Sequence, residues 1–216
     1  MLEDRLTDIK IAFNSGANIA PGYAISLTGP AVAEHINNYS RLGVKGVIIA
    51  ENNYDTYLGI RQDVAKIIGG PNIAVHYKDV DEVVLNSFMT KITPIIDIDL
   101  DFTATPKNVM GTVSDVLRRM DTIIGKHSLA DRFTFTVTFC QRNAGRDSVN
   151  NGYESIVNFF NLSSGFNIVR AYKQSYRDGS PMVTAMYLID KLTTKVFKGP
   201  YDDIEPLLIT TGKRKF

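Results

Sequence analysis

The feature that most constrains this fold is a regular alternation of short apolar runs with stretches whose apolar residues recur at helical spacing. The expected strands are 23–27, 44–50, 72–77, 93–100, 133–139, 167–176 and 181–192, and the expected helices are 31–42, 54–68, 81–88, 107–124 and 153–162. The resulting order, βαβαβαβαβαββ, predicts an α/β fold. Right-handed crossovers would build a doubly wound, mostly parallel sheet with helices on both faces. Asp178-Gly179 between the last two strands predicts a C-terminal antiparallel hairpin.

Composition restricts the class of protein further. The chain has 216 residues, of which 44% are hydrophobic and 22% charged, which predicts one globular domain and excludes a disordered protein. Within residues 1–216, we expect an N-terminal extension over 1–20 and a basic tail over 208–216. The lone Cys140, the absence of a long apolar run and a polar N-terminus predict a soluble, cytoplasmic protein without a membrane partner.

Acidic residues follow several of the expected strands, where open α/β sheets bind their ligands. Glu51 ends the second strand, about 20 residues after the first strand–helix turn, and its two oxygens suit the adjacent hydroxyls of a ribose. A surface acid that caps the next helix is the competing interpretation. For Asp79, after the third strand, capping of the next helix is favoured over a contact with an adenine amino group.

The segment 95–103, IIDIDLDFT, is the most informative in the chain. Strand alternation places Asp97, Asp99 and Asp101 on one side, with Ile96, Ile98, Leu100 and Phe102 on the other. Carboxylates in a central strand are costly unless they are paired, hydrated or bound to a ligand. This segment therefore predicts a functional site, with Asp101 at its mouth.

Taken together, the acid after the second strand, the Asp-Phe-Thr-Ala-Thr loop (101–105) and the Thr-rich fifth strand before a hairpin resemble a class I S-adenosylmethionine-dependent methyltransferase, a Rossmann-like fold. The resemblance spans about residues 20–192 and is greatest to the small, divergent enzymes of viruses and phages, which would act in the host cytoplasm. It implies S-adenosylmethionine as the cofactor and no bound metal. It implies a cofactor site formed by Thr28, Gly29, Glu51, Asn52, Asp79 and Asp99, with Asp101 and Phe102 at the reacting groups.

The chain departs from the pattern of that family at two places. The first turn, Thr28-Gly29-Pro30, has one glycine where the family has several, and Pro30 removes a backbone donor. The Asp/Asn-Pro-Pro-Tyr/Phe motif of amino-methylating enzymes is absent, so methylation of a base amino group is not expected.

Two other functions remain open. The Asp97, Asp99 and Asp101 strand could hold Mg²⁺ in a nucleotidyl or phosphoryl transfer enzyme, because hard cations prefer carboxylate oxygens. Alternatively, the chain could be a non-catalytic Rossmann-like binding or assembly module.

The charge distribution could attract a nucleic acid to the C-terminal half, although a mixed solvated surface is the favoured interpretation of so small a bias. Residues 101–216 carry 16 Lys and Arg against 11 Asp and Glu, whereas residues 1–100 carry 8 against 12. Arg142 and Arg146, after the fifth strand, are placed to meet substrate phosphates, which a forked guanidinium binds well. Solvated loop charges are the competing interpretation of both arginines.

Overall fold

The computed structural model describes residues 21–29, 32–142, 146–163, 165–178, 180–192 and 208–209. Its strands are β1 (Tyr23–Ser26), β2 (Gly46–Glu51), β3 (Asn72–Tyr77), β4 (Ile95–Asp101), β5 (Leu129–Cys140), β6 (Phe166–Asp178), β7 (Ser180–Lys191) and β8 (Leu208–Ile209). Its helices are α2 (Val32–Arg41), α3 (Tyr54–Val64), α4 (Val80–Met89), α5 (Pro106–Met120), α6 (Ile123–Ser128) and α7 (Arg146–Leu162). The expected extension 1–20 lies outside the described residues, as does the expected tail apart from β8.

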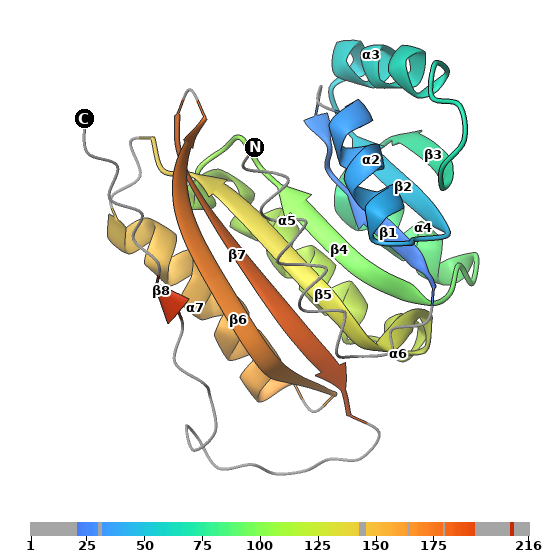
Figure 1. The fold of residues 1–216 in the computed structure, drawn as a ribbon. Helices are drawn as coiled ribbons and strands as arrows, with labels where there is room; N and C mark the ends of the chain where they lie inside the picture. The colour runs from blue at the N-terminus through green and yellow to red at the C-terminus, as the bar shows by residue number, and fades with distance from the viewer. Residues whose placement is uncertain are drawn as a thin grey trace.

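All described strands join one eight-stranded sheet in the order β3-β2-β1-β4-β5-β7-β6-β8 (Figure 1). Strands β1 to β5 pair in parallel, and β7 runs antiparallel to both of its neighbours, β5 and β6. The strand order reverses between β1 and β4, since the chain first adds β2 and β3 on one side and then β4 and β5 on the other. The predicted doubly wound sheet and its C-terminal hairpin are confirmed.

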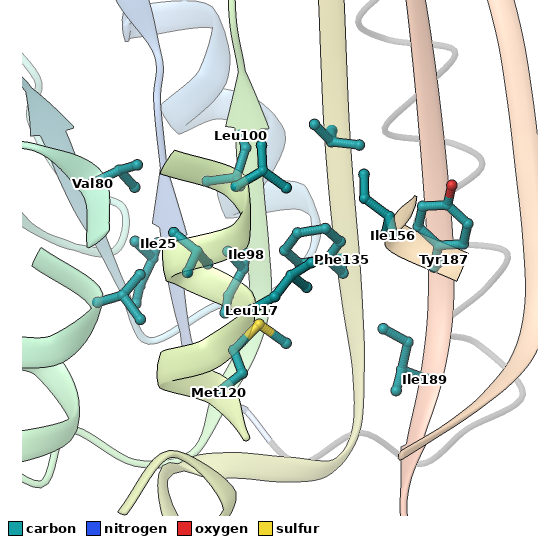
Figure 2. Packing of buried hydrophobic residues seen from close by; sticks show 14 of the residues in the cluster. Ile25, Val80, Ile98, Leu100, Leu117, Met120, Phe135, Ile156, Tyr187 and Ile189 are labelled. Atoms are coloured by element: carbon teal, nitrogen blue, oxygen red, sulfur yellow. The ribbon is translucent and has the colours of Figure 1, made fainter. Parts of the chain in front are cut away.

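Helices cover both faces of this sheet. Apolar residues of α2 and α3 pack on one face of the β1–β2–β4 region, around Ile36, Val47 and Ile60. Apolar residues of α4, α5 and α7 pack on the opposite face, where Figure 2 shows Leu117 and Ile156 among the strand residues. We call these the α2 face and the α5 face of the sheet. None of the helices in the described ranges is long and apolar enough to cross a bilayer.

The helix expected over 107–124 is two helices in the structure. Helix α5 ends at Met120, and Thr122 then caps the short helix α6 by accepting a hydrogen bond from Gly125 N at 3.0 Å. A Cβ on Gly125 would lie 2.2 Å from Arg119 O, so this close approach of α6 to the end of α5 requires glycine. His127 and Asp131, which fall between the expected helix 107–124 and the expected strand 133–139, lie in α6 and β5.

Strand β4 departs from simple alternation near its start. Its register shifts between Ile95 and Asp97 against both neighbouring strands. As a result, Ile96 packs on the α2 face while Ile95 and Ile98 pack on the α5 face. The prediction that Ile96 lies opposite the aspartates is therefore wrong, because a bulge places an extra residue in this strand.

Candidate functional site at the carboxyl edge of the sheet

The parallel register brings the predicted cofactor residues to one edge of the sheet. Ser26, at the end of β1, pairs with Ile49 of β2 and with Asp99 of β4, and Glu51 pairs with Tyr77 at the end of β3. The segments that follow these strands therefore start at the same carboxyl edge of the sheet, and those after β1 and β4 flank the point where the strand order reverses. They carry Thr28 and Gly29 after β1, Glu51 and Asn52 at the end of β2, Asp79 after β3, and Asp99 and Asp101 in β4.

Glu51 organises the turn from β2 into α3. Its Oε1 accepts a hydrogen bond from Asn53 N at 2.7 Å, and Asn53 in turn caps α3 by accepting from Thr56 N at 3.0 Å. Glu51 thus supports the helix start without capping it directly. Among the described residues this contact uses only Oε1, which leaves Oε2 of the half-buried carboxylate for a ligand donor.

Asn52 and Asp79 connect the ends of β2 and β3. The Asn52 amide donates to Asp79 Oδ1 at 2.7 Å. Asp79 occupies the N-cap position of α4, but its side chain makes no capping hydrogen bond. The favoured prediction that the Asp79 side chain caps α4 is therefore wrong. The carboxylate instead accepts a hydrogen bond from Asn52 at the shared edge.

Asp97 lies deepest of the three β4 aspartates and is almost fully buried, at 3% exposure. Its Oδ2 accepts a hydrogen bond from the Tyr39 hydroxyl at 2.9 Å, and its Oδ1 accepts one from the Thr134 hydroxyl. Burial raises the pKa of Tyr39 well above its usual value, and the charges of Asp97 and Asp99 raise it further. Tyr39 therefore stays protonated as a donor, and Asp97 serves to anchor α2 and β5 to β4.

Closer to the edge, Asp99 lies between hydroxyl side chains on the two flanking strands. It pairs in register with Ser26 of β1 and with Thr136 of β5, and both hydroxyls are buried. Thr136 Oγ1 makes no hydrogen bond within the described residues. A polar ligand group above Asp99 would satisfy Thr136, whose unpaired burial is otherwise costly.

Asp101 ends the row at the mouth of the site. It pairs with Thr138 of β5, whose hydroxyl is hydrogen-bonded to that of Thr184 in β7 at 2.7 Å. Asp101 is half-buried, in contrast to Asp97. The aspartates were predicted to share one side of the strand. Their register partners in β5 are threonines that alternate with apolar residues of the α5 face, so the three aspartates lie on the α2 face as predicted.

The first turn offers space rather than a glycine-rich cradle. Gly29 has φ of +52°, which favours glycine, and no atom lies within 4 Å of the position where its Cβ would be. Thr28 is buried, and its hydroxyl donates to Gly29 O at 3.3 Å. Pro30 lies outside the described residues. The turn can therefore admit a ligand close to the backbone.

Of the residues predicted to meet the substrate, Arg142 lies just after β5 and is exposed, with its guanidinium donating to the Ser180 hydroxyl. Arg146 begins α7, and its side chain lies outside the described residues. Phe102 stacks on Phe139 with ring centroids 6.4 Å apart and an interplanar angle of 9°. One face of the Phe102 ring is thus occupied by the core, and its predicted role as a platform for a substrate stays a prediction.

Cys140, the lone cysteine of the chain, is buried at the end of β5. Among the described residues, no three His, Cys, Asp or Glu side chains are grouped to hold a metal ion. Both carboxylate oxygens of Asp97 are engaged by hydroxyls, those of Tyr39 and Thr134.

Tyr39 is the site residue that the sequence analysis missed. It follows Val32 and Ile36 on the buried stripe of α2, and helical spacing alone would have placed it on the sheet. A buried tyrosine needs a partner for its hydroxyl, and the strand expected over 93–100 carries two acids, Asp97 and Asp99, in an apolar run. This combination of an inward tyrosine and an acidic strand was the available signal.

No protein-family model and no curated protein sequence matches the chain. Solved structures do match in fold. A candidate methyltransferase from Streptococcus mutans, solved in complex with SAH, superposes with a TM-score of 0.56 at 14% identity, covering 86% of this chain and 97% of that one. An rRNA methylase from Streptococcus thermophilus gives 0.52 at 13% identity, covering 86% and 95%. A candidate methyltransferase from Escherichia coli gives 0.52 at 14% identity, covering 87% and 86%.

These likenesses show that the chain has the class I methyltransferase fold, as the sequence predicted. The three source organisms are bacteria, so the prediction of a viral or phage type stays a prediction.

Proposed function

We propose that the protein is a methyltransferase that uses S-adenosylmethionine. The observation that carries this proposal is the convergence of Glu51, Asp79 and Asp99 at the carboxyl edge of the sheet, where the strand order reverses. The likeness to a structure solved with SAH supports the same cofactor class. When bound, the cofactor supplies a sulfonium methyl group that a nucleophile can accept, with S-adenosylhomocysteine as the leaving group.

The residues at the edge fit the parts of this cofactor. Glu51 would accept hydrogen bonds from ribose hydroxyls through its available Oε2, and the Asn52–Asp79 pair would border the adenine. Asp99 and the unpaired Thr136 hydroxyl would receive the cationic amino-acid end, since an ammonium needs several acceptors. Gly29 leaves the room that a ligand beside β1 requires.

For the methyl acceptor, we propose a nucleic acid group other than a base amino group. Support comes from the exposed Arg142 beyond β5 and from the likeness to an rRNA methylase. Asp101 would orient or deprotonate the nucleophile, and methyl transfer depends chiefly on such alignment. The proposal predicts labelled methyl transfer to RNA, reduced at least several-fold by Arg142→Ala. Transfer to protein but not to nucleic acid would reject this acceptor while leaving the cofactor proposal intact.

Calorimetric titration with S-adenosylhomocysteine tests the cofactor. Replacing Glu51 by alanine removes charge-assisted hydrogen bonds and should weaken binding by about 1.5–3 kcal/mol, roughly 10- to 150-fold. Glu154→Ala is the matched control, because Glu154 is an exposed acid on α7, on the far side of the sheet. Equal affinities of the two variants would remove the ribose assignment. Absence of binding by the unsubstituted protein would instead favour a non-catalytic binding or assembly module.

A further inference from the structure

The edge strand β3 lacks the features that usually protect a sheet edge. In the described part of the chain it pairs with β2 alone, and its register with β2 runs without a bulge over all six residues. Its sequence, NIAVHY, contains no Lys, Arg, Asp, Glu or Pro. Both ends and one face of the strand are exposed. Natural proteins normally block such an edge with charge, proline or a bulge, because an open edge pairs with other strands.

Hydrogen bonding shows which backbone groups point outward from β3. Asn72 N donates to Lys45 O, and Lys78 N donates to Glu51 O, both at 3.0 Å. Because alternate residues of a strand bond to the same neighbour, the intervening N–H and C=O groups of Ile73, Val75 and Tyr77 point away from β2. Within the ranges that the structure describes, these three residues form the unpaired edge.

A second copy of the same strand complements this edge. A two-fold axis at Val75 would place two β3 strands antiparallel, with Val75 opposite Val75 and Ile73 opposite Tyr77 of the other copy. Each of these pairs presents outward N–H and C=O groups, which gives about six hydrogen bonds across the interface. Aromatic residues opposite β-branched ones are among the more favourable cross-strand pairs. No like charges oppose each other, since Lys78 meets the uncharged segment 67–72.

Exposed apolar side chains lie at both ends of β3, where the same two-fold axis would bring them together. Before the strand, Ile68 is 99% exposed. At the other end, Tyr77 is 50% and Tyr54 is 55% exposed, and these rings contact each other with centroids 5.4 Å apart. The two-fold axis brings the Ile68 end of one strand beside the tyrosine end of the other. One two-fold arrangement would therefore cover Ile68 and the Tyr54–Tyr77 pair in both copies.

We propose that the protein forms a symmetric dimer through β3, which joins the two sheets into one continuous sheet. The partner's segment 68–72 would then lie beside Tyr77 and Asp79, at the β3 end of the candidate site. The inference does not depend on methyl transfer, because it rests on the edge strand alone. Figure 1 shows β3 at the outer end of the sheet, far from the β6–β7 hairpin.

Sedimentation equilibrium tests the dimer, with an expected mass of twice the 24.0 kDa chain. Val75→Lys places two like charges opposite each other and should weaken dimerisation at least tenfold. Leu162→Lys is the matched control, because Leu162 is an exposed apolar residue at the end of α7, and it should leave the dimer unchanged. Circular dichroism verifies that both variants are folded.

Disulfide cross-linking tests the register and does not depend on the charge variant. The pairing places the two Val75 Cα atoms about 5.5 Å apart, which is within reach of a disulfide. Val75→Cys should therefore give a covalent dimer on mild oxidation, whereas Asn72→Cys should not, because the two Asn72 residues lie at opposite ends of the paired strands. A monomer at high protein concentration, a dimer insensitive to Val75→Lys, or equal cross-linking of the two cysteine variants would overturn the proposal.

Discussion

The two faces of β5 have nearly opposite chemistry. On the α5 face, Phe133, Phe135 and Phe139 are completely buried. Phe135, labelled in Figure 2, contacts Phe160 of α7 edge-on with ring centroids 5.7 Å apart. On the α2 face, Thr134 and Thr136 are just as buried, and they adjoin the aspartates of β4. Burial is therefore equal on the two faces, while polarity differs.

The apolar α5 face mainly stabilises the sheet, whereas the polar α2 face carries the groups of the candidate site. Apolar burial contributes about 25 cal/mol for each Å² removed from water, so the α5 face is favourable wherever it is well packed. Buried hydroxyls and carboxylates are favourable only where each one has a partner. On the α2 face, Asp97 has such partners in Tyr39 and Thr134, whereas Thr136 has none among the described residues. On the polar face, the hydrogen bonds of Asp97 are therefore complete, whereas Thr136, nearer the carboxyl edge, has no hydrogen-bond partner among the described residues.

The largest expected effect comes from breaking the anchor. Tyr39→Phe removes the hydrogen bond to the buried Asp97 carboxylate and should lower the free energy of unfolding by about 1.5–3 kcal/mol, measured by urea denaturation at pH 7. Tyr187→Phe is the matched control on the α5 face, where the Tyr187 hydroxyl makes no hydrogen bond with the described residues. It should change stability by less. An equal loss in both variants would mean that the two faces do not differ in this way.

The pH dependence sharpens the same comparison. Because burial raises the pKa of Tyr39 above 10.0, the unfolded chain releases this proton at lower pH than the folded protein does. The stabilisation from Tyr39 is therefore complete below pH 10 and is lost as the pH rises through the folded-state pKa. The difference in stability between the unsubstituted protein and Tyr39→Phe should shrink above pH 10. A constant difference up to pH 11 would contradict this assignment.

The order of elements and the reversal of strand order, with the strand-end acids at one edge of the sheet, were predictable from the sequence. Both depend on local patterns, namely apolar periodicity and the residues that follow each strand. The strand 72–77 was predicted with its observed bounds, because Gly69-Gly70-Pro71 before it and Lys78-Asp79 after it are clear boundaries.

Other features depend on contacts between distant residues and could not be predicted in this way. The bulge in β4 appears only when its register is compared with β1 and β5. Tyr39 and Asp97 are 58 residues apart, and no local pattern connects them. The turn of Asp79 toward Asn52 likewise needs the ends of β2 and β3 side by side, since an N-cap position alone predicts a bond to the helix.

The smallest effects come from two threonines of β5 that differ only in their partners. Thr138→Val breaks the hydrogen bond to Thr184 and should cost about 1 kcal/mol of stability. Thr136→Val removes a buried hydroxyl without a hydrogen bond in the described residues, so the free energy of unfolding should stay equal or rise slightly. The same change should weaken S-adenosylhomocysteine binding several-fold if the ligand completes this hydroxyl. A Thr136 variant that loses as much stability as the Thr138 variant would show that the α2 face is already complete, and that the unpaired hydroxyl does not mark the ligand position.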